Sequence, residues 1–166
     1  MKQRIIALIL AVSITLLDQL TKFLVSETKP FLQIIPGFFN IHYIENTGAA
    51  FGILQGRLTF LAIISTIAIG VLVFLIFHER SPHWGTLIAL ACILGGTSGN
   101  LIDRVRLRYV VDFLQFYITV SQKTYYWPSF NIADTFISIG VGLLILFMLF
   151  SQEQQPDVVS EGHSLD

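Results

Sequence analysis

Four aspartates lie within apolar segments of this sequence or in the loops that return to them: Asp18, Asp103, Asp112 and Asp134. Ionisable side chains in such positions usually face a protein interior and mark function. Two carboxyl groups held close in a low-dielectric setting cannot both ionise cheaply, so one of them retains its proton. The ionised member can deprotonate a water molecule, and the protonated member can polarise a peptide carbonyl. The acids therefore predict hydrolysis by an aspartate pair that titrates as a unit.

Asp112 and Asp134 are the better candidates for this pair. Asp112 lies in a loop that returns towards an apolar segment, and Asp134 lies at a predicted helix start. The other two aspartates have cations nearby in the sequence, Lys22 and Arg104, and are expected to brace helices instead. All four acids could also be structural, and the spacing alone leaves that alternative open.

Other catalytic groups are poorly supported. The four histidines are scattered, without HExxH or Cys/His spacing, so we expect no metal site. Cys92, the only cysteine, lies inside an apolar run and cannot form an intrachain disulfide. Neither a Ser/His/Asp nor a Cys/His arrangement is therefore predicted.

The stretch 95–113 combines glycines with polar residues in a way that an ordinary membrane helix does not. Gly95 and Gly99 form a GxxxG pattern, which commonly means close helix packing. Helix packing does not explain Asn100, Asp103 and Arg104. The first two share a helical face with two of the glycines. The members of this face follow at i, i+3, i+4 and i+7: Gly96, Gly99, Asn100 and Asp103.

Two further segments carry polar stripes at helical spacing. One comprises Thr15, Asp18, Gln19 and Lys22, and the other comprises Asn131, Asp134, Thr135 and Ser138. Asn131 could simply cap a helix, and Asp134 could be a first-turn acid favoured by the helix dipole. A loop of small residues after Asn46 is either a turn or a place where a substrate backbone approaches closely.

The composition places the chain in the membrane class. Of its 166 residues 54% are hydrophobic and 13% are charged, and the mean hydropathy is +0.71. A net charge of −1 argues against a nucleic-acid partner. Segments of roughly 20 apolar residues span a bilayer. We predict four such spans, at about residues 5–25, 58–77, 84–102 and 132–150.

The segments between the spans are of two kinds. Residues 31–55 and 107–130 contain aromatic and β-branched patches typical of short strands. Residues 151–166 hold four acids and no Lys or Arg, which predicts a disordered tail after a single domain at 1–150.

Four spans place both termini on one side, so the unusual polar residues gather at the opposite face. Lys2 and Arg4 favour a cytoplasmic N-terminus. A raw count of cations favours the reverse, because most basic residues lie on the far side: Lys29, Arg57, Arg104, Arg106, Arg108 and Lys123. Charge alone leaves the orientation open.

The sequence resembles the lipoprotein signal peptidases (signal peptidase II), a family of bacterial membrane aspartyl proteases. Five blocks in the family's order carry the resemblance: residues 18–22 (DQLTK), 46–52 (NTGAAFG), 95–104 (GGTSGNLIDR), 111–113 (VDF) and 130–134 (FNIAD). The blocks are distributed from the first span to the fourth, and only the acidic tail lies outside the region over which they extend.

The resemblance implies a mainly α membrane protein with four transmembrane helices, a small β-rich periplasmic cradle from the first long loop, and a second extramembrane loop. It implies a location in the bacterial inner membrane, with both termini in the cytoplasm. It also implies that the enzyme needs no cofactor. Its substrate would be a prolipoprotein with a diacylglyceryl cysteine, cleaved before that cysteine. The partners would be this substrate and membrane lipid, and the enzyme is expected to act as a monomer. Asp112 and Asp134 match the catalytic dyad, with Asn46, Gly48, Asn100, Arg104 and Asn131 lining the site, and Asp18, Lys22 and Asp103 supporting it.

Two other classes of function fit parts of the pattern. Intramembrane acids also serve transporters and proton relays, although here they gather at one face instead of threading the bilayer. A structural membrane subunit could use the same acids as packing contacts. Cleavage of a diacylglyceryl prolipoprotein separates the three.

Overall fold

The computed structural model describes residues 1–48, 54–78 and 83–152. The loop residues 49–52 and the predicted tail from residue 153 onward lie outside the described residues. The last helix includes Ser151 and Gln152, which were predicted to belong to the tail.

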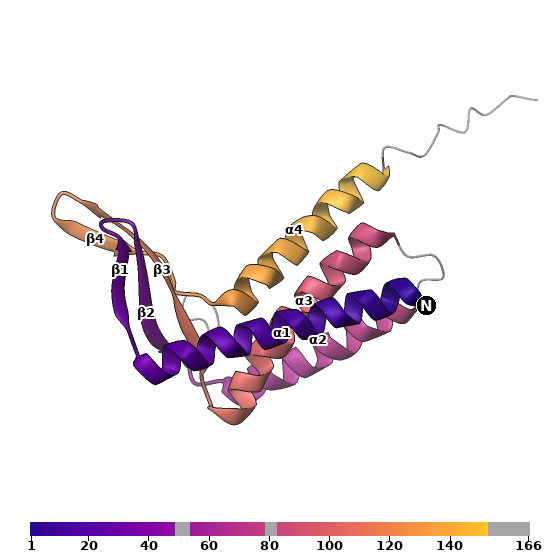
Figure 1. Cartoon of the computed structure of the whole chain (residues 1–166), viewed down its shortest axis with the longest axis horizontal. Helices are drawn as coiled ribbons and strands as arrows, with labels where there is room; N and C mark the ends of the chain where they lie inside the picture. The colour runs from indigo at the N-terminus through magenta and orange to yellow at the C-terminus, as the bar shows by residue number, and fades with distance from the viewer. Residues whose placement is uncertain (49–53, 79–82, 153–166) are drawn as a thin grey trace, which may run out of the picture.

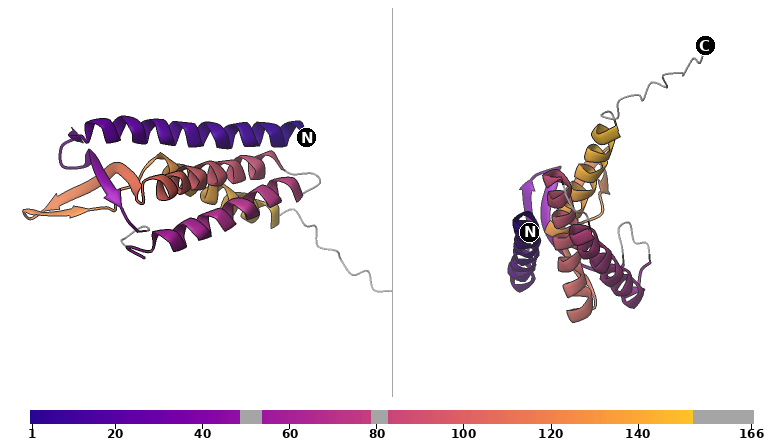
Figure 2. Two further views of the ribbon diagram at one scale, coloured as in Figure 1. Left: turned by 90° about the horizontal axis from the view of Figure 1, so that it is seen from below. Right: turned by 90° about the vertical axis from the view of Figure 1, so that its right-hand side faces the viewer.

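The helices of the described chain form a multi-pass membrane protein. They are α1 (Lys2–Thr28), α2 (Leu58–His78), α3 (Trp84–Arg106) and α4 (Ile132–Gln152). All four are long and apolar enough to cross a membrane, within the residues described. The most deeply buried is α3, which packs against each of the other three and lies between α1 and α2 (Figure 2, left). Polar residues on α3 can therefore reach three neighbouring helices.

Glycines allow α3 to approach its neighbours closely. A Cβ on Gly95 would lie 2.6 Å from the Ala11 carbonyl oxygen of α1, and one on Gly99 would clash with the Asp18 carboxylate. On the adjacent face, a Cβ on Gly96 would clash with the Ala133 carbonyl oxygen of α4. The GxxxG pattern thus does serve packing, as expected for a small-residue helix interface.

Replacing Gly95 with alanine is expected to destabilise the protein by about 1–3 kcal/mol, because the added methyl meets backbone that cannot move away. The matched control is Gly70→Ala in α2, where an added Cβ meets nothing within 4 Å. Alanine favours helix there, so the control should be neutral or slightly stabilising. Thermal unfolding in detergent measures both, and equal midpoints for the two variants would contradict the close contact.

An antiparallel sheet lies at the end of the helices opposite the N-terminus (Figure 1). Its strands are β1 (Phe31–Ile35), β2 (Phe39–Asn46), β3 (Val110–Val120) and β4 (Lys123–Tyr126), in the order β1-β2-β3-β4. The pairing of β2 with β3 joins the two long loops in one sheet. The strands expected in both long loops are confirmed, and the second loop adds β3 and β4 to the sheet that the resemblance placed in the first. Cross-strand pairing, which sequence spacing does not reveal, unites them.

The pairing of β3 positions Asp112 beside the start of α4. Asp112 lies opposite Ile44 of β2, after an irregularity in register that begins at Ile41. On the other side, the Phe113 and Leu114 N–H groups donate to the Phe130 carbonyl at 3.1 and 2.9 Å. Backbone hydrogen bonds thus hold residue 130, and the helix start that follows it, against β3.

Candidate active site at the junction of sheet and helices

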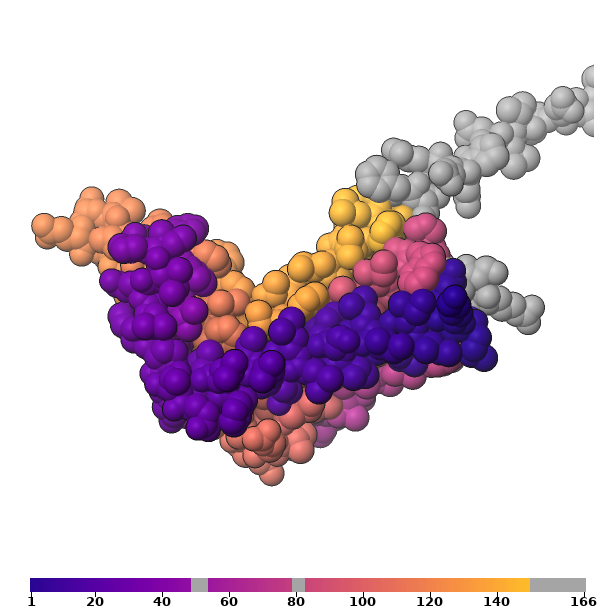
Figure 3. Space-filling view, in the orientation of Figure 1, coloured from indigo at the N-terminus to yellow at the C-terminus, as the bar shows by residue number. Residues whose placement is uncertain are grey.

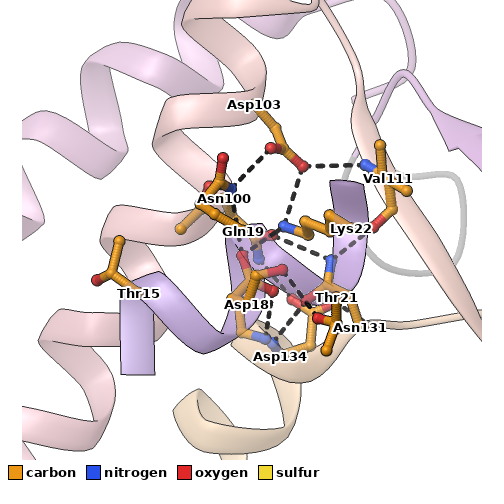
Figure 4. A network of polar contacts seen from close by, with 12 residues as sticks. Thr15, Asp18, Gln19, Thr21, Lys22, Asn100, Asp103, Val111, Asn131 and Asp134 are labelled. Atoms are coloured by element: carbon orange, nitrogen blue, oxygen red, sulfur yellow. Dashed lines mark hydrogen bonds and ion pairs between the residues drawn. The ribbon is translucent and has the colours of Figure 1, made fainter. Parts of the chain in front are cut away.

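Buried polar side chains from α1, α3 and the start of α4 meet beside Val111 of β3, where the sheet joins the helices (Figure 4). The Asp112 side chain of β3 joins them through Asn131. Each is at most 5% exposed: Asp18, Lys22, Asn100, Asp103, Asp112 and Asn131. Buried polar groups are stable only when they are paired or hydrogen-bonded. The contacts among them therefore define the site.

Lys22 is the central cation of this cluster. Its Nζ lies 2.9 Å from Asp18 Oδ2 and 2.9 Å from Asp103 Oδ2, and it donates to Asn100 Oδ1 at 2.8 Å. These three partners use all three donors of an ammonium group. The sequence suggested Arg104 as the cation near Asp103; in the structure the ion pair of Asp103 is with Lys22.

The two aspartates that bind Lys22 also hold backbone elements in place. Asp18 Oδ1 accepts from the Ala133 N–H in the first turn of α4 at 2.9 Å, and Asp103 Oδ2 accepts from the Val111 N–H at 3.1 Å. Gln19 links the same groups by donating to Asp103 Oδ1 at 2.9 Å and to the Gly99 carbonyl at 3.1 Å. The cluster therefore fixes the start of α4 and of β3 against α1.

Asn131 and Asp134 cap α4 reciprocally. Asn131 Oδ1 accepts from the Asp134 N–H at 2.9 Å, and Asp134 Oδ2 accepts from the Asn131 N–H at 3.3 Å. This is the geometry of a capping box. The capping and first-turn roles suggested by the sequence are thus real, and they leave Asp134 Oδ1 to accept from Asn100 Nδ2 at 2.7 Å.

Two asparagine amides hold the Asp112 carboxyl group from opposite sides. Asn131 Nδ2 donates to Asp112 Oδ1 at 2.8 Å, and Asn46 Nδ2 donates to Oδ2 at 2.8 Å. Asn131 Nδ2 also lies 3.1 Å from Asn100 Oδ1, while Asn46 Oδ1 accepts from the Gly48 N–H at 2.9 Å. Amide groups therefore connect Asp112 to Asp134 through Asn131 and Asn100.

Both aspartates line one pocket of about 500 Å³. The space-filling surface is hollowed between the sheet and α4 (Figure 3). The polar lining residues are Asn46, Asn100, Arg104, Asp112, Ser129, Asp134, Thr135 and Ser138, and apolar ones include Val110, Trp127, Phe130, Ile137 and Ile139. A pocket with an apolar wall and a few convergent polar groups suits a ligand that is partly lipid-like.

Burial and a neighbouring acid change the ionisation of Asp112. Loss of solvent raises its pKa most, and the charge of Asp134 raises it further, to about 7. The hydrogen bonds from Asn46 and Asn131, and the charge of Lys22, act in the opposite direction. The two acids thus interact electrostatically, and near neutral pH Asp112 is partly protonated.

Arg104 occupies the wall of the pocket without a close ion pair in the described chain. Its Nη1 lies 3.5 Å from the Asn100 carbonyl, and its Nε is buried without a hydrogen-bond partner. Arg104 thus places a guanidinium group in the same pocket wall as Asp112 and Asp134.

The structure brings all ten site residues suggested by the sequence to this junction, directly or through the Lys22 cluster. Sequence reasoning did not assign site positions to the lining residues Trp127, Ser129, Thr135 and Ser138. Thr135 and Ser138 did belong to the polar stripe that begins at Asn131, and this periodicity is the signal that could have identified them. Within the described residues, no group of three or more His, Cys, Asp or Glu side chains could hold a metal ion.

The fold and the site together define a multi-pass membrane protein with a pair of interacting acids, Asp112 buried and Asp134 half-buried, at one end of its helices. The family described as signal peptidase (SPase) II matches residues 10–150. The chain belongs to this family and is a peptidase of the membrane.

Relatives and solved structures agree with this assignment. The lipoprotein signal peptidase of Syntrophus aciditrophicus is 44% identical, over 93% of this chain and 98% of its own. That of Geobacter sulfurreducens is 43% identical, over 84% of this chain and 88% of its own. A bacterial membrane enzyme solved by the in meso method at 2.3 Å resolution has a TM-score of 0.81 and 34% identity, covering 91% of this chain and 92% of the other.

Proposed function

We propose that this protein is an aspartyl endopeptidase that removes the signal peptide from diacylglyceryl-modified prolipoproteins, cleaving before the modified cysteine. One observation carries the proposal: Asp112 and Asp134 line the same pocket, and the charge of Asp134 helps to raise the pKa of Asp112 to about 7. Such a pair provides a general base and a general acid at neutral pH.

The hydrogen bonds suggest how the two carboxyl groups divide the work. Asp134 accepts from Asn100 Nδ2 and from the Asn131 N–H, contacts that suit a carboxylate. It would take a proton from the attacking water. Asp112, which retains a proton below pH 7, would donate it towards the scissile carbonyl. Arg104, whose guanidinium group lines the pocket, would help to hold the substrate backbone.

The place of the pocket and the names of the relatives support this substrate class. The pocket lies at the helix ends, where a peptide bond next to a membrane-anchored segment can meet water. Its apolar wall can contact the lipid on the cysteine. Asn46, Gly48, Asn100 and Asn131 would bind the substrate or support the dyad, and Asp18, Lys22 and Asp103 would hold the helices that carry it. Residues 1–150 would form one peptidase domain that acts as a monomer.

The test is a cleavage assay with purified protein and a diacylglyceryl prolipoprotein, next to the same precursor without its lipid. We expect cleavage of the modified precursor only, unaffected by a chelator. Cleavage of neither precursor by a protein shown to be folded would contradict the proposal. Strong inhibition by the chelator would point to a metallopeptidase instead.

The activity should decline in alkaline solution. Above pH 7 Asp112 loses its proton, so no acid remains in the pair, and kcat/KM should fall with an apparent pKa of about 7. The free energy of unfolding should also decrease as the pH rises, but over a lower pH range than the activity. The folded protein holds a proton that the unfolded chain releases near pH 3.8, so stability decreases from about pH 4 to about pH 7. An activity constant from pH 6 to 9 would contradict the assignment.

We further propose that both termini are cytoplasmic and that the pocket opens on the periplasmic side. In a background with Cys92 replaced by alanine, a cysteine at Gln122, in the β3–β4 turn, should react with an impermeant thiol reagent on intact spheroplasts. The matched cysteine at Gln3, near the start of α1, should react only after lysis. The opposite pattern would reverse the orientation.

A further inference from the structure

A second groove lies on the outer face of the helices, between α2 and α3. It measures about 310 Å³ and is lined by one face of α2 and by the C-terminal end of α3. The α2 residues recur at helical spacing over about 12 Å of its axis: Thr59, Ala62, Ile63, Thr66 and Ile67. The remaining lining residues are Arg104, Val105 and Arg108.

The walls of this groove face the region that the bilayer would occupy. Ile63 is 54% exposed and Val105 is 64% exposed, and α2 is among the least buried of the helices. Exposed branched apolar side chains along a membrane helix are ordinarily covered by acyl chains. The groove is therefore suited to hold a lipid chain against the protein.

The charge at the mouth of the groove determines which lipid fits. Two guanidinium groups, those of Arg104 and Arg108, line it, and no acid does. Neither Arg108 nor Arg104 makes an ion pair within the described residues. Arg57 lies one residue before α2. Its charge adds to the positive potential that the helix dipole already produces at the N-terminal end of α2. Guanidinium groups bind phosphate in a fixed, often bidentate geometry.

We propose that this groove binds one anionic phospholipid, with its phosphate on Arg108 and Arg104 and an acyl chain along α2. A neutral diacylglyceryl group would fill the apolar part equally well, but it carries no anion to pair with the arginines. The groove and the substrate pocket share Arg104 and no other lining residue. Lipid binding is measured without turnover, so the proposal does not depend on the peptidase mechanism.

Native mass spectrometry of the full-length protein in detergent tests the site. The probes are phosphatidylglycerol, phosphatidylcholine with the same acyl chains, and the corresponding diacylglycerol. We expect one phosphatidylglycerol to bind more tightly than either of the others. Arg108→Gln should weaken its binding about fivefold, the contribution of one arginine near a phosphate. Equal binding of phosphatidylcholine or of diacylglycerol would overturn the proposal.

Two variants separate a specific site from general surface charge. Arg106→Gln removes a neighbouring exposed arginine that does not line the groove, and it should change phosphatidylglycerol binding less than twofold. Ile63→Trp fills the groove from an exposed position and should reduce binding while both arginines remain. An equal loss in Arg106→Gln and Arg108→Gln, or unchanged binding in Ile63→Trp, would reject the site.

Discussion

Replacing Asp112 or Asp134 with asparagine is expected to lower the rate of prolipoprotein cleavage by about 10³-fold in each case. General acid–base groups contribute on this scale, and the two carboxyl groups act together, so either loss should remove nearly the whole effect. The double variant should therefore be little worse than each single one. A cleavage time course with the diacylglyceryl precursor measures all three.

The asparagine variants must be shown to fold. In Asp112→Asn, the amides of Asn46 and Asn131 meet a side chain with one acceptor oxygen where the carboxylate offered two. A modest change in thermal stability is expected, partly offset because no buried charge remains. Glu27→Gln, at an exposed position on α1, is the matched control and should keep full activity. If either aspartate variant keeps more than a tenth of the wild-type rate while folded, the dyad assignment is wrong.

Replacing Lys22 with methionine should have the largest effect on stability. The Lys22 side chain is 3% exposed and neutralises Asp18 and Asp103, each at 2.9 Å. Removing one partner of a buried ion pair leaves an uncompensated charge and typically costs about 3–5 kcal/mol. Asn100 Oδ1 also loses one of its two donors and keeps only Asn131 Nδ2, so the hold of Asn100 on Asp134 should loosen and activity should fall as well.

Two comparisons isolate the cause. Lys29→Met removes a lysine that is 62% exposed and lies 4.0 Å from Glu45, so it should change the unfolding midpoint little. Combining Lys22→Met with Asp103→Asn removes one of the stranded charges and should recover part of the lost stability. Thermal unfolding in detergent measures each variant. A Lys22→Met protein as stable as Lys29→Met would show that the buried pair contributes nothing.

The local features of the site were predictable because they depend on short-range rules. Apolar length identified the spans, and the stripe at i, i+3, i+4 and i+7 identified the polar faces of α1 and α3. The helix start at Asn131 and the acid three residues later form the capping box that their spacing favours. The family resemblance named the same residues and was confirmed by the match over residues 10–150.

Contacts between distant segments were not predictable in this way. Arg104 follows Asp103 directly in the sequence, yet the ion pair of Asp103 is with Lys22 of α1. Adjacent residues on a helix point in different directions, so proximity in sequence is a poor guide to pairing. Likewise, the two long loops each looked capable of forming strands, and only the β2–β3 register shows that they share one sheet.

The sequence by itself therefore determined the membrane class, the ends of the helices where polar groups gather, and the set of residues available for chemistry. These follow from hydropathy and from period-3.6 spacing, which act along the chain. The tertiary structure decided which carboxyl group each amide holds, that Asp112 and Asp134 line one pocket, and that Asp112 has a pKa of about 7. Burial and charge proximity arise only when α1, α3, α4 and the sheet pack together, and these two effects turn ordinary aspartates into an interacting pair.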